Sequence, residues 1–199
     1  MSKYFNQVYQ FKITLNYTKP AIWRRILVPA NYSFWDLHVA IQDSMGWLDY
    51  HLHMFELINP ATNIKVEIGA PDEEYESYGR FLLPENKVKI SKYFKETNQK
   101  ARYEYDFGDS WIHTVKFEKI IPVSAGEKYP KCITGKMACP PEDCGGIGGY
   151  YDMLSILNNP KDEEYDGMIE WLGGKYDPQL FDPNAVSFDD PLKRWNISL

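Results

Sequence analysis

The sequence predicts an α+β fold in which helices pack on one side of a mixed or antiparallel sheet. Apolar and polar residues alternate strictly over 8–17, which is the period of a half-buried strand. Apolar residues then recur at helical spacing over 34–48. Two further alternating segments, 102–107 and 111–117, are joined by a Gly-Asp turn signal and form a hairpin. Hairpins and helices that occur in separate runs are typical of α+β proteins.

The chain opens in the order strand, strand, helix, strand, as β-grasp folds and many other α+β folds do. The second strand covers 21–28 and the third 53–58. Ser33 is a suitable N-cap for the intervening helix, Asp36 completes a capping box, and Gly46 lies near its C-terminal end. We expect alternate residues of the first strand to face the core: Tyr9, Phe11, Ile13, Leu15 and Tyr17.

Shorter elements follow. A fourth strand is predicted over 65–68, and an exposed acidic loop over 69–80. Residues 87–94 are predicted to form a short strand that leads into a turn of helix. In the hairpin, the alternation predicts one face for the following side chains: Tyr103, Tyr105 and Phe107 on its first strand, and Trp111, His113, Val115 and Phe117 on its second.

The C-terminal third begins with a segment over 129–149 that is too rich in Pro and Gly for a helix or a central strand. Helices are predicted over 150–157 and 162–172, and the acidic start of the second suits the positive end of a helix. The tail, 175–199, contains three Asp-Pro pairs and is expected to be extended over the domain. We interpret residues 1–199 as one domain, large enough to build a core without disulfides.

The composition disfavours several classes of partner. The chain has 28 acidic and 22 basic residues, a net charge of -6, whereas nucleic-acid binding needs a basic footprint. No apolar segment approaches the length of a membrane span, and the first residues do not form a signal peptide. We therefore expect a cytoplasmic protein without membrane association, whose partner is another protein or a small molecule.

All three cysteines lie within thirteen residues of the Pro- and Gly-rich segment: Cys132, Cys139 and Cys144. Thiols stay reduced in the cytoplasm, and an odd number does not fit a disulfide framework. One interpretation is a metal site, with zinc as the candidate cofactor and His113, Glu142 or Asp143 as the fourth ligand. The spacings depart from common zinc patterns, so a tight structural loop with buried thiols is an alternative. A redox or nucleophilic cysteine beside the following helix is another.

A second group of candidates surrounds the hairpin turn. Asp106 and Asp109 put paired carboxylates near Trp111, which suits cation binding or acid–base chemistry, although turns also select Asp for backbone reasons. His113 falls on the core side of its strand and is either a buried histidine bonded to a carbonyl or a ligand below the cysteines. The candidate ligand-binding residues are Asp106, Asp109, Trp111, His113, Glu142 and Asp143.

The other histidines are weaker candidates. His51 and His53 would face the same way on a strand and could share a metal; the alternative is a turn residue followed by a half-buried strand residue. His38 is expected at the surface or its boundary. The chain has no nucleophile elbow, His-Glu-x-x-His motif, P-loop or Rossmann pattern, so the sequence leaves an enzymatic activity undecided.

Several motifs in a fixed order resemble the plasmid pRiA4b ORF-3-like family from about residue 8 to about residue 185. They are 11–15 (FKITL), 20–26 (PAIWRRI), 34–38 (FWDLH), 45–47 (MGW), 105–113 (YDFGDSWIH), 139–146 (CPPEDCGG) and 149–150 (GY). The resemblance implies a compact α+β domain in which the aspartates, His113 and the cysteine segment form a shared constellation. It implies no catalytic assignment, because the biochemical function of the family is unknown.

Three functions fit the sequence. The first is a binding module with a metal held by Cys132, Cys139, Cys144 and a fourth ligand such as His113. The second is a metal-dependent hydrolase that uses the aspartates of the hairpin turn and His113. The third is a plasmid or mobile-element accessory protein that acts on DNA through a basic stripe. The stripe would consist of Arg24, Arg25, Lys87, Lys89 and Lys92.

Overall fold

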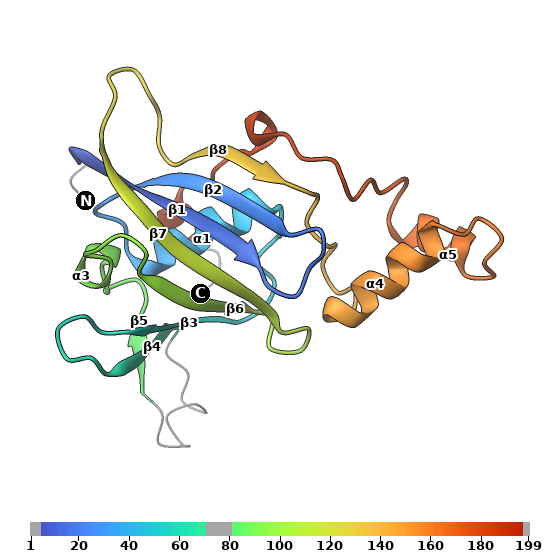
Figure 1. The fold of residues 1–199 in the computed structure, drawn as a ribbon, viewed down its shortest axis with the longest axis horizontal. Coiled ribbons are helices and arrows are strands. Elements are labelled where there is room, and N and C mark those ends of the chain that lie inside the picture. The colour runs from blue at the N-terminus through green and yellow to red at the C-terminus, as the bar shows by residue number, and fades with distance from the viewer. Residues whose placement is uncertain (1–4, 71–80, 197–199) are drawn as a thin grey trace.

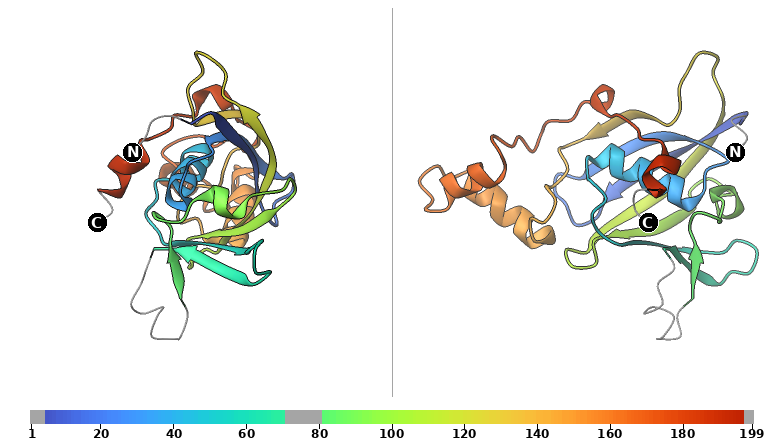
Figure 2. Two further views of the ribbon diagram at one scale, coloured as in Figure 1. Left: turned by 90° about the vertical axis from the view of Figure 1, so that its left-hand side faces the viewer. Right: turned by 180° about the vertical axis from the view of Figure 1, so that it is seen from behind.

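A computed structural model describes residues 5–70 and 81–196, and its main feature is a curled sheet around a central helix (Figures 1 and 2). Within these residues the strands are β1 (Gln7–Leu15), β2 (Ile22–Pro29), β3 (His53–Ile58), β4 (Lys65–Gly69), β5 (Leu82–Pro84), β6 (Lys100–Tyr105), β7 (Trp111–Pro122) and β8 (Lys131–Lys136). Their order is β5-β4-β3-β6-β7-β1-β2-β8, and only the β4–β5 pair is parallel. The predicted α+β class with a mixed sheet is therefore confirmed.

The helices differ in what they cover. The central helix lies inside the curve of the sheet, whereas two C-terminal helices project beyond one end of it (Figures 1 and 2). The helices are α1 (Phe34–Met45), α3 (Ile90–Tyr93), α4 (Gly146–Leu157), α5 (Tyr165–Trp171), the short 3-10 helix η1 (Pro183–Ala185) and α6 (Pro191–Trp195). No helix among the described residues is long and apolar enough to cross a membrane.

The start and end of α1 follow the signals in the sequence. The backbone N–H of Asp36 donates to Ser33 Oγ, and the N–H of Ser33 donates to Asp36 Oδ2, which completes the predicted capping box. Gly46 ends the helix at a φ of 94°, a conformation that glycine adopts without steric cost. Most of α1 is buried, because the sheet curves around it.

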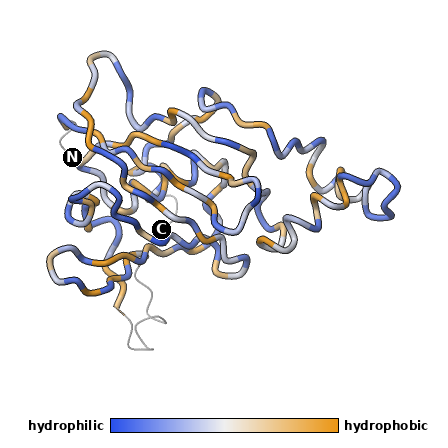
Figure 3. The backbone as a smooth tube through the Cα atoms, viewed as in Figure 1, coloured by the Kyte–Doolittle hydropathy of each residue, from blue (hydrophilic) through white to orange (hydrophobic). Residues whose placement is uncertain are grey.

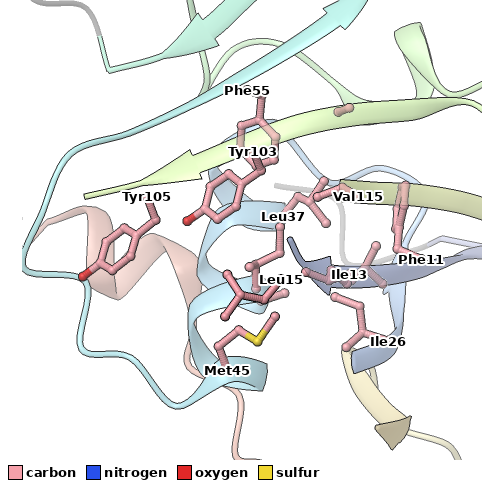
Figure 4. Packing of buried hydrophobic residues seen from close by; sticks show 14 of the residues in the cluster. Phe11, Ile13, Leu15, Ile26, Leu37, Met45, Phe55, Tyr103, Tyr105 and Val115 are labelled. Carbon is pink, nitrogen blue, oxygen red and sulfur yellow. The ribbon is translucent and has the colours of Figure 1, made fainter. Parts of the chain in front are cut away.

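The core lies between α1 and the concave face of the sheet. Figure 4 shows Ile13 and Leu15 of β1 packed with Leu37 and Met45 of α1. Figure 3 shows hydrophobic stretches concentrated in the sheet and a hydrophilic connection between α4 and α5. Burial of these side chains contributes about 1.5–3 kcal/mol each, which holds α1 in place beneath the strands.

Two aromatic residues that the alternation places in the core are instead exposed. Tyr17 has 71% of its surface accessible and Phe107 has 44%. Both follow the last residue of a strand, since β1 ends at Leu15 and β6 at Tyr105. The backbone then turns with a φ of 66° at Tyr17 and 56° at Asp106, so the period of two does not extend to them.

Several predicted boundaries are wrong. The segment over 129–149 is not one loop, because β8 occupies its first part as an edge strand beside β2, where Pro and Gly are tolerated. Gly145, at a φ of 87°, turns the chain into α4 earlier than predicted. The turn of helix α3 is present, but the strand before it is β5, and Lys89 makes only an isolated bridge to Ser33.

The C-terminal segment has an irregular backbone apart from η1 and α6 and packs on the domain. The N–H of Ala138 donates to the carbonyl of Pro178, and Trp35 Nε1 donates to the carbonyl of Pro191 on α6. Helix α5 begins at Tyr165, three residues later than predicted. Most of the acidic loop predicted over 69–80 lies outside the described residues.

Candidate functional site

Three potential metal ligands converge at the end of the sheet where β6 turns into β7. His51 belongs to the connection between α1 and β3, Asp106 to the hairpin turn, and Asp143 to the connection between β8 and α4. His51 Nε2 lies 2.9 Å from Asp143 Oδ1 and 3.7 Å from Asp106 Oδ2. One ligand atom from each residue lies within 4.8 Å of the other two. We call these three residues the outer site.

Both carboxylates of the outer site are oriented by a turned backbone. Asp106 and Asp143 each adopt a φ of 56°, which Asp tolerates better than most residues. Asp106 Oδ1 accepts a hydrogen bond of 2.9 Å from the N–H of Gly108, so the turn holds this carboxylate in place. Asp106 is buried, whereas Asp143 is exposed, and the site therefore opens to solvent on the Asp143 side.

Glu142 lies next to the outer site and connects it to the α1–β3 loop. Its Oε1 accepts hydrogen bonds from the N–H of Leu48 (2.7 Å) and from the hydroxyl of Tyr105 (3.1 Å). Burial, and to a smaller extent the charge of Asp143, raises the pKa of the Glu142 carboxyl. A carboxyl of this kind holds its proton to a higher pH than an exposed glutamate and can act as an acid or a base.

Asp109 anchors the start of α4 and is not part of the outer site. Its Oδ2 accepts a 3.1 Å hydrogen bond from the N–H of Gly145. The backbone approach is close here, because a Cβ added to Gly146 would lie 2.5 Å from the carbonyl oxygen of Asp109. The hairpin turn and the segment that carries Asp143 are thus held together by backbone contacts that require glycine.

A cleft of about 470 Å³ adjoins this region. Glu142 and Asp143 form part of its wall, Trp171 and Tyr176 contribute aromatic surface, and Lys175 adds one positive charge. Half of the surface of Trp171 is exposed. The cleft therefore combines an acidic rim with aromatic walls, which is a common composition for small-ligand sites.

Trp111 and His113, two of the predicted ligand-binding residues, lie in the core and are fully buried. His113 Nδ1 donates a 2.9 Å hydrogen bond to the carbonyl of Trp111, and the ring packs against Trp47. Burial lowers the pKa of His113 to about 3, so its imidazole is neutral at physiological pH. His113 is therefore the buried histidine bonded to a carbonyl, which was one of the two alternatives that the sequence left open.

The three cysteines are free thiols in different settings. Cys132 lies on β8, while Cys139 and Cys144 lie on the connection to α4. Burial raises the pKa of all three thiols, that of Cys144 to about 12, and the nearby Arg24 offsets only part of this effect for the other two. Within the described ranges, neither cluster of three potential metal ligands includes a cysteine. The predicted thiolate metal site stays a prediction.

A second cluster, which we call the inner site, consists of His38, Asp49 and His53. His38 is fully buried, so the expectation of a position at the surface or its boundary is wrong; its ring is covered by His53 of β3 and Tyr103 of β6. His51 and His53 do not share one cluster, because His51 precedes the first residue of β3 and turns away from His53. Periodicity gave no signal for Asp49, which lies in a loop.

These features define a class of protein: an α+β domain with an imidazole–carboxylate cluster beside an aromatic cleft and without a recognised catalytic motif. The chain belongs to the plasmid pRiA4b ORF-3-like protein family, which it matches over residues 7–185. It is 32% identical over 192 residues to the uncharacterized protein y4hQ of Sinorhizobium fredii, with 94% of each chain covered. The crystal structure of MM3350 from Methanosarcina mazei Go1, a protein of unknown function, is similar with a TM-score of 0.85 and 46% identity, covering 93% of this chain and 100% of that chain.

Proposed function

We propose that the protein is a binding module that holds a divalent metal ion at the outer site, His51, Asp106 and Asp143, and receives a ligand in the adjoining cleft. The observation that carries this proposal is the convergence of three ligand atoms from three separate segments within 4.8 Å. Zinc lies about 2.0–2.2 Å from such ligands, so tetrahedral partners are about 3.4 Å apart. Side-chain movements of about 1 Å would suffice to enclose an ion.

The composition of the cleft suggests what the ligand contains. Three protein ligands leave a coordination position open, and Asp143 belongs both to the outer site and to the cleft wall. A ligand with an oxygen-donor group could bind the ion there, while its apolar or planar part packs on Trp171 and Tyr176. The proposed partner is therefore a small molecule or the end of a peptide. The ion that it contacts would be held by His51, Asp106 and Asp143 and not by the thiols.

Two other features bear on the context of the protein. We propose a cytoplasmic location, which the three free thiols support. The alternative function on DNA gains little support from the basic stripe, because Arg24 is buried and Arg25 pairs with Glu118 at 2.7 Å. Two of its five cations are therefore unavailable to phosphates.

Titration with Mn²⁺, followed by amide NMR spectra, tests the binding proposal, because a paramagnetic ion that accepts imidazole and carboxylate ligands broadens nearby signals. We expect selective broadening around residues 51, 106 and 143. The Asp143→Asn variant should bind at least about 10-fold more weakly. Asp166→Asn, which changes an exposed acid at the start of α5, is the matched control and should leave the affinity unchanged. Equal affinity in all three proteins, or diffuse broadening at exposed acids, would contradict the proposal.

A second candidate function is metal-dependent hydrolysis, which the raised pKa of Glu142 favours. An ion with an open position could bind water, and Glu142 could accept its proton. With Mn²⁺ present, p-nitrophenyl esters and phosphodiesters are simple probes. We expect turnover that Glu142→Gln abolishes while the Mn²⁺-dependent broadening persists. Rates no higher than those of the free ion would argue against this activity.

A further inference from the structure

The inner site is separate from the outer site and lies deeper in the molecule. His38 comes from α1, His53 is the first residue of β3, and Asp49 lies in the loop between them. Glu85, directly after β5, completes the group through its contact with His53. All four side chains are more than nine-tenths buried.

The geometry brings two imidazole rings and two carboxylates into direct contact. The rings of His38 and His53 stack with centroids 3.4 Å apart and planes inclined by 5°. His38 Nε2 lies 2.7 Å from Asp49 Oδ1, and His53 Nε2 lies 2.5 Å from Glu85 Oε2. On its other side, His38 Nδ1 is 2.8 Å from the hydroxyl of Tyr103. One ligand atom each from His38, Asp49 and His53 lies within 4.8 Å of the other two.

Burial leaves part of this group without partners. Asp49 Oδ2 and Glu85 Oε1 are buried and accept no hydrogen bond. An unsatisfied buried oxygen of a charged group is costly, so such atoms indicate a missing partner. Arg194 of α6 lies beside the group, with its Nη1 4.0 Å from Asp49 Oδ2 and its Nη2 in contact with Asp43 and Asp189.

Formal charges point the same way. Asp49 and Glu85 are the two buried carboxylates that contact the imidazole rings, whereas Asp43 and Asp189 pair with the guanidinium of Arg194. The two negative charges of Asp49 and Glu85 equal the charge of one divalent cation. A buried charge without compensation is strongly destabilising, whereas an ion coordinated by these groups satisfies them.

We infer that the inner site binds a divalent transition-metal ion of the zinc class through His38, Asp49 and His53. Glu85 is a positioning residue that holds the His53 ring, as carboxylates commonly hold metal-binding histidines. Tyr103 holds the His38 ring in the same way. Such an ion would cross-link α1, the following loop and β3, and its role would be structural because α6 and Trp35 cover the site.

The test uses the full-length Asp143→Asn protein, in which ion binding at the outer site is weakened, so that the inner site is measured separately from the proposed function. The protein is unfolded, freed of metal with a chelator, and refolded with or without Zn²⁺ or Co²⁺. We expect about one ion per chain after gel filtration, a visible Co²⁺ spectrum of nitrogen and oxygen ligands, and a higher Tm with Zn²⁺. A folded protein without bound ion and with an unchanged Tm would overturn the inference.

Further variants in the same background identify the ligands. Asp49→Asn should weaken Zn²⁺ binding by at least about 100-fold, and Glu85→Gln by about 10- to 100-fold. Asp166→Asn, which changes an exposed acid at the start of α5, is the matched control, and the affinity of this variant for Zn²⁺ should match that of the background protein. Ion binding that survives Asp49→Asn would overturn the assignment. If Asp49→Asn does not fold, the stoichiometry and Co²⁺ spectrum of the background protein decide the question alone.

Discussion

Replacing His113 with glutamine is expected to reduce the loss of stability that the protein suffers in mild acid. His113 is fully buried, and burial lowers its pKa from 6.5 to about 3. The unfolded chain therefore binds a proton at His113 below about pH 6.5, whereas the folded protein does not until about pH 3. Folding stability must fall as the pH falls through this window, with a slope of up to about 1.4 kcal/mol per pH unit.

The magnitude follows from these two pKa values. Between about pH 7 and pH 5, the proton on the unfolded imidazole costs the wild-type protein about 2 kcal/mol. Glutamine has no titratable group and can still donate to the carbonyl of Trp111, so the His113→Gln variant should lack this part of the loss. Contributions from all other titrating groups occur in both proteins and cancel in the comparison.

Urea unfolding at the two pH values, followed by tryptophan fluorescence, measures the difference. We expect the stability of the wild type to decrease by about 2 kcal/mol more than that of the variant. Equal decreases would refute the reasoning, because they would mean that His113 takes up its proton in the folded protein. A Trp111→Phe control keeps the histidine and should retain the full acid sensitivity.

Three further substitutions test the fold around the sites, each measured by urea unfolding. Arg24→Met should cost about 3–5 kcal/mol, because the buried guanidinium donates to three backbone carbonyls that would lose their partner. Gly146→Ala should cost about 1–3 kcal/mol, since the added Cβ would lie 2.5 Å from the carbonyl oxygen of Asp109, whereas Gly148→Ala meets nothing within 4 Å and should be neutral or stabilising. Ser33→Ala removes the N-cap of α1 and should cost about 1 kcal/mol.

Local signals in the sequence were sufficient for most of the fold. The capping box at Ser33, the glycine at position 46 and the alternation in β1, β6 and β7 act within a few residues, so the chain itself carries the information. β8 was not predicted because its pairing with β2 is non-local, and its Gly135 is explained only by distant residues, the ring of Phe181 in the tail and the carbonyl of Trp23 on β2. The predicted burial of Tyr17 and Phe107 was wrong because alternation does not reveal where a strand ends.

The clusters were harder to predict, for a different physical reason. Asp49, Asp106 and Asp143 all lie in loops and adopt φ values of 62°, 56° and 56°. Neither a helical nor a strand period describes where such a side chain points. The sequence therefore marked Asp106 and Asp143 as candidates from their chemistry but could not pair them with His51. It also could not show that His38, on a helix, would contact the buried carboxylate of Asp49 and stack on His53.

The two clusters are mechanically connected by the short loop between α1 and β3. Asp49 belongs to the inner site and His51, two residues later, to the outer site. In the same loop, the N–H of Leu48 donates to the carboxylate of Glu142, and the N–H of Tyr50 donates to the hydroxyl of Tyr105. An ion at the inner site would fix the backbone of this loop and with it the position of His51. Once one ion has ordered this loop, binding of the second ion no longer carries the entropy cost of ordering it. By linkage, each ion should therefore raise the affinity of the protein for the other. The inner site would thus act as the rigid support on which the binding surface of the outer site is built.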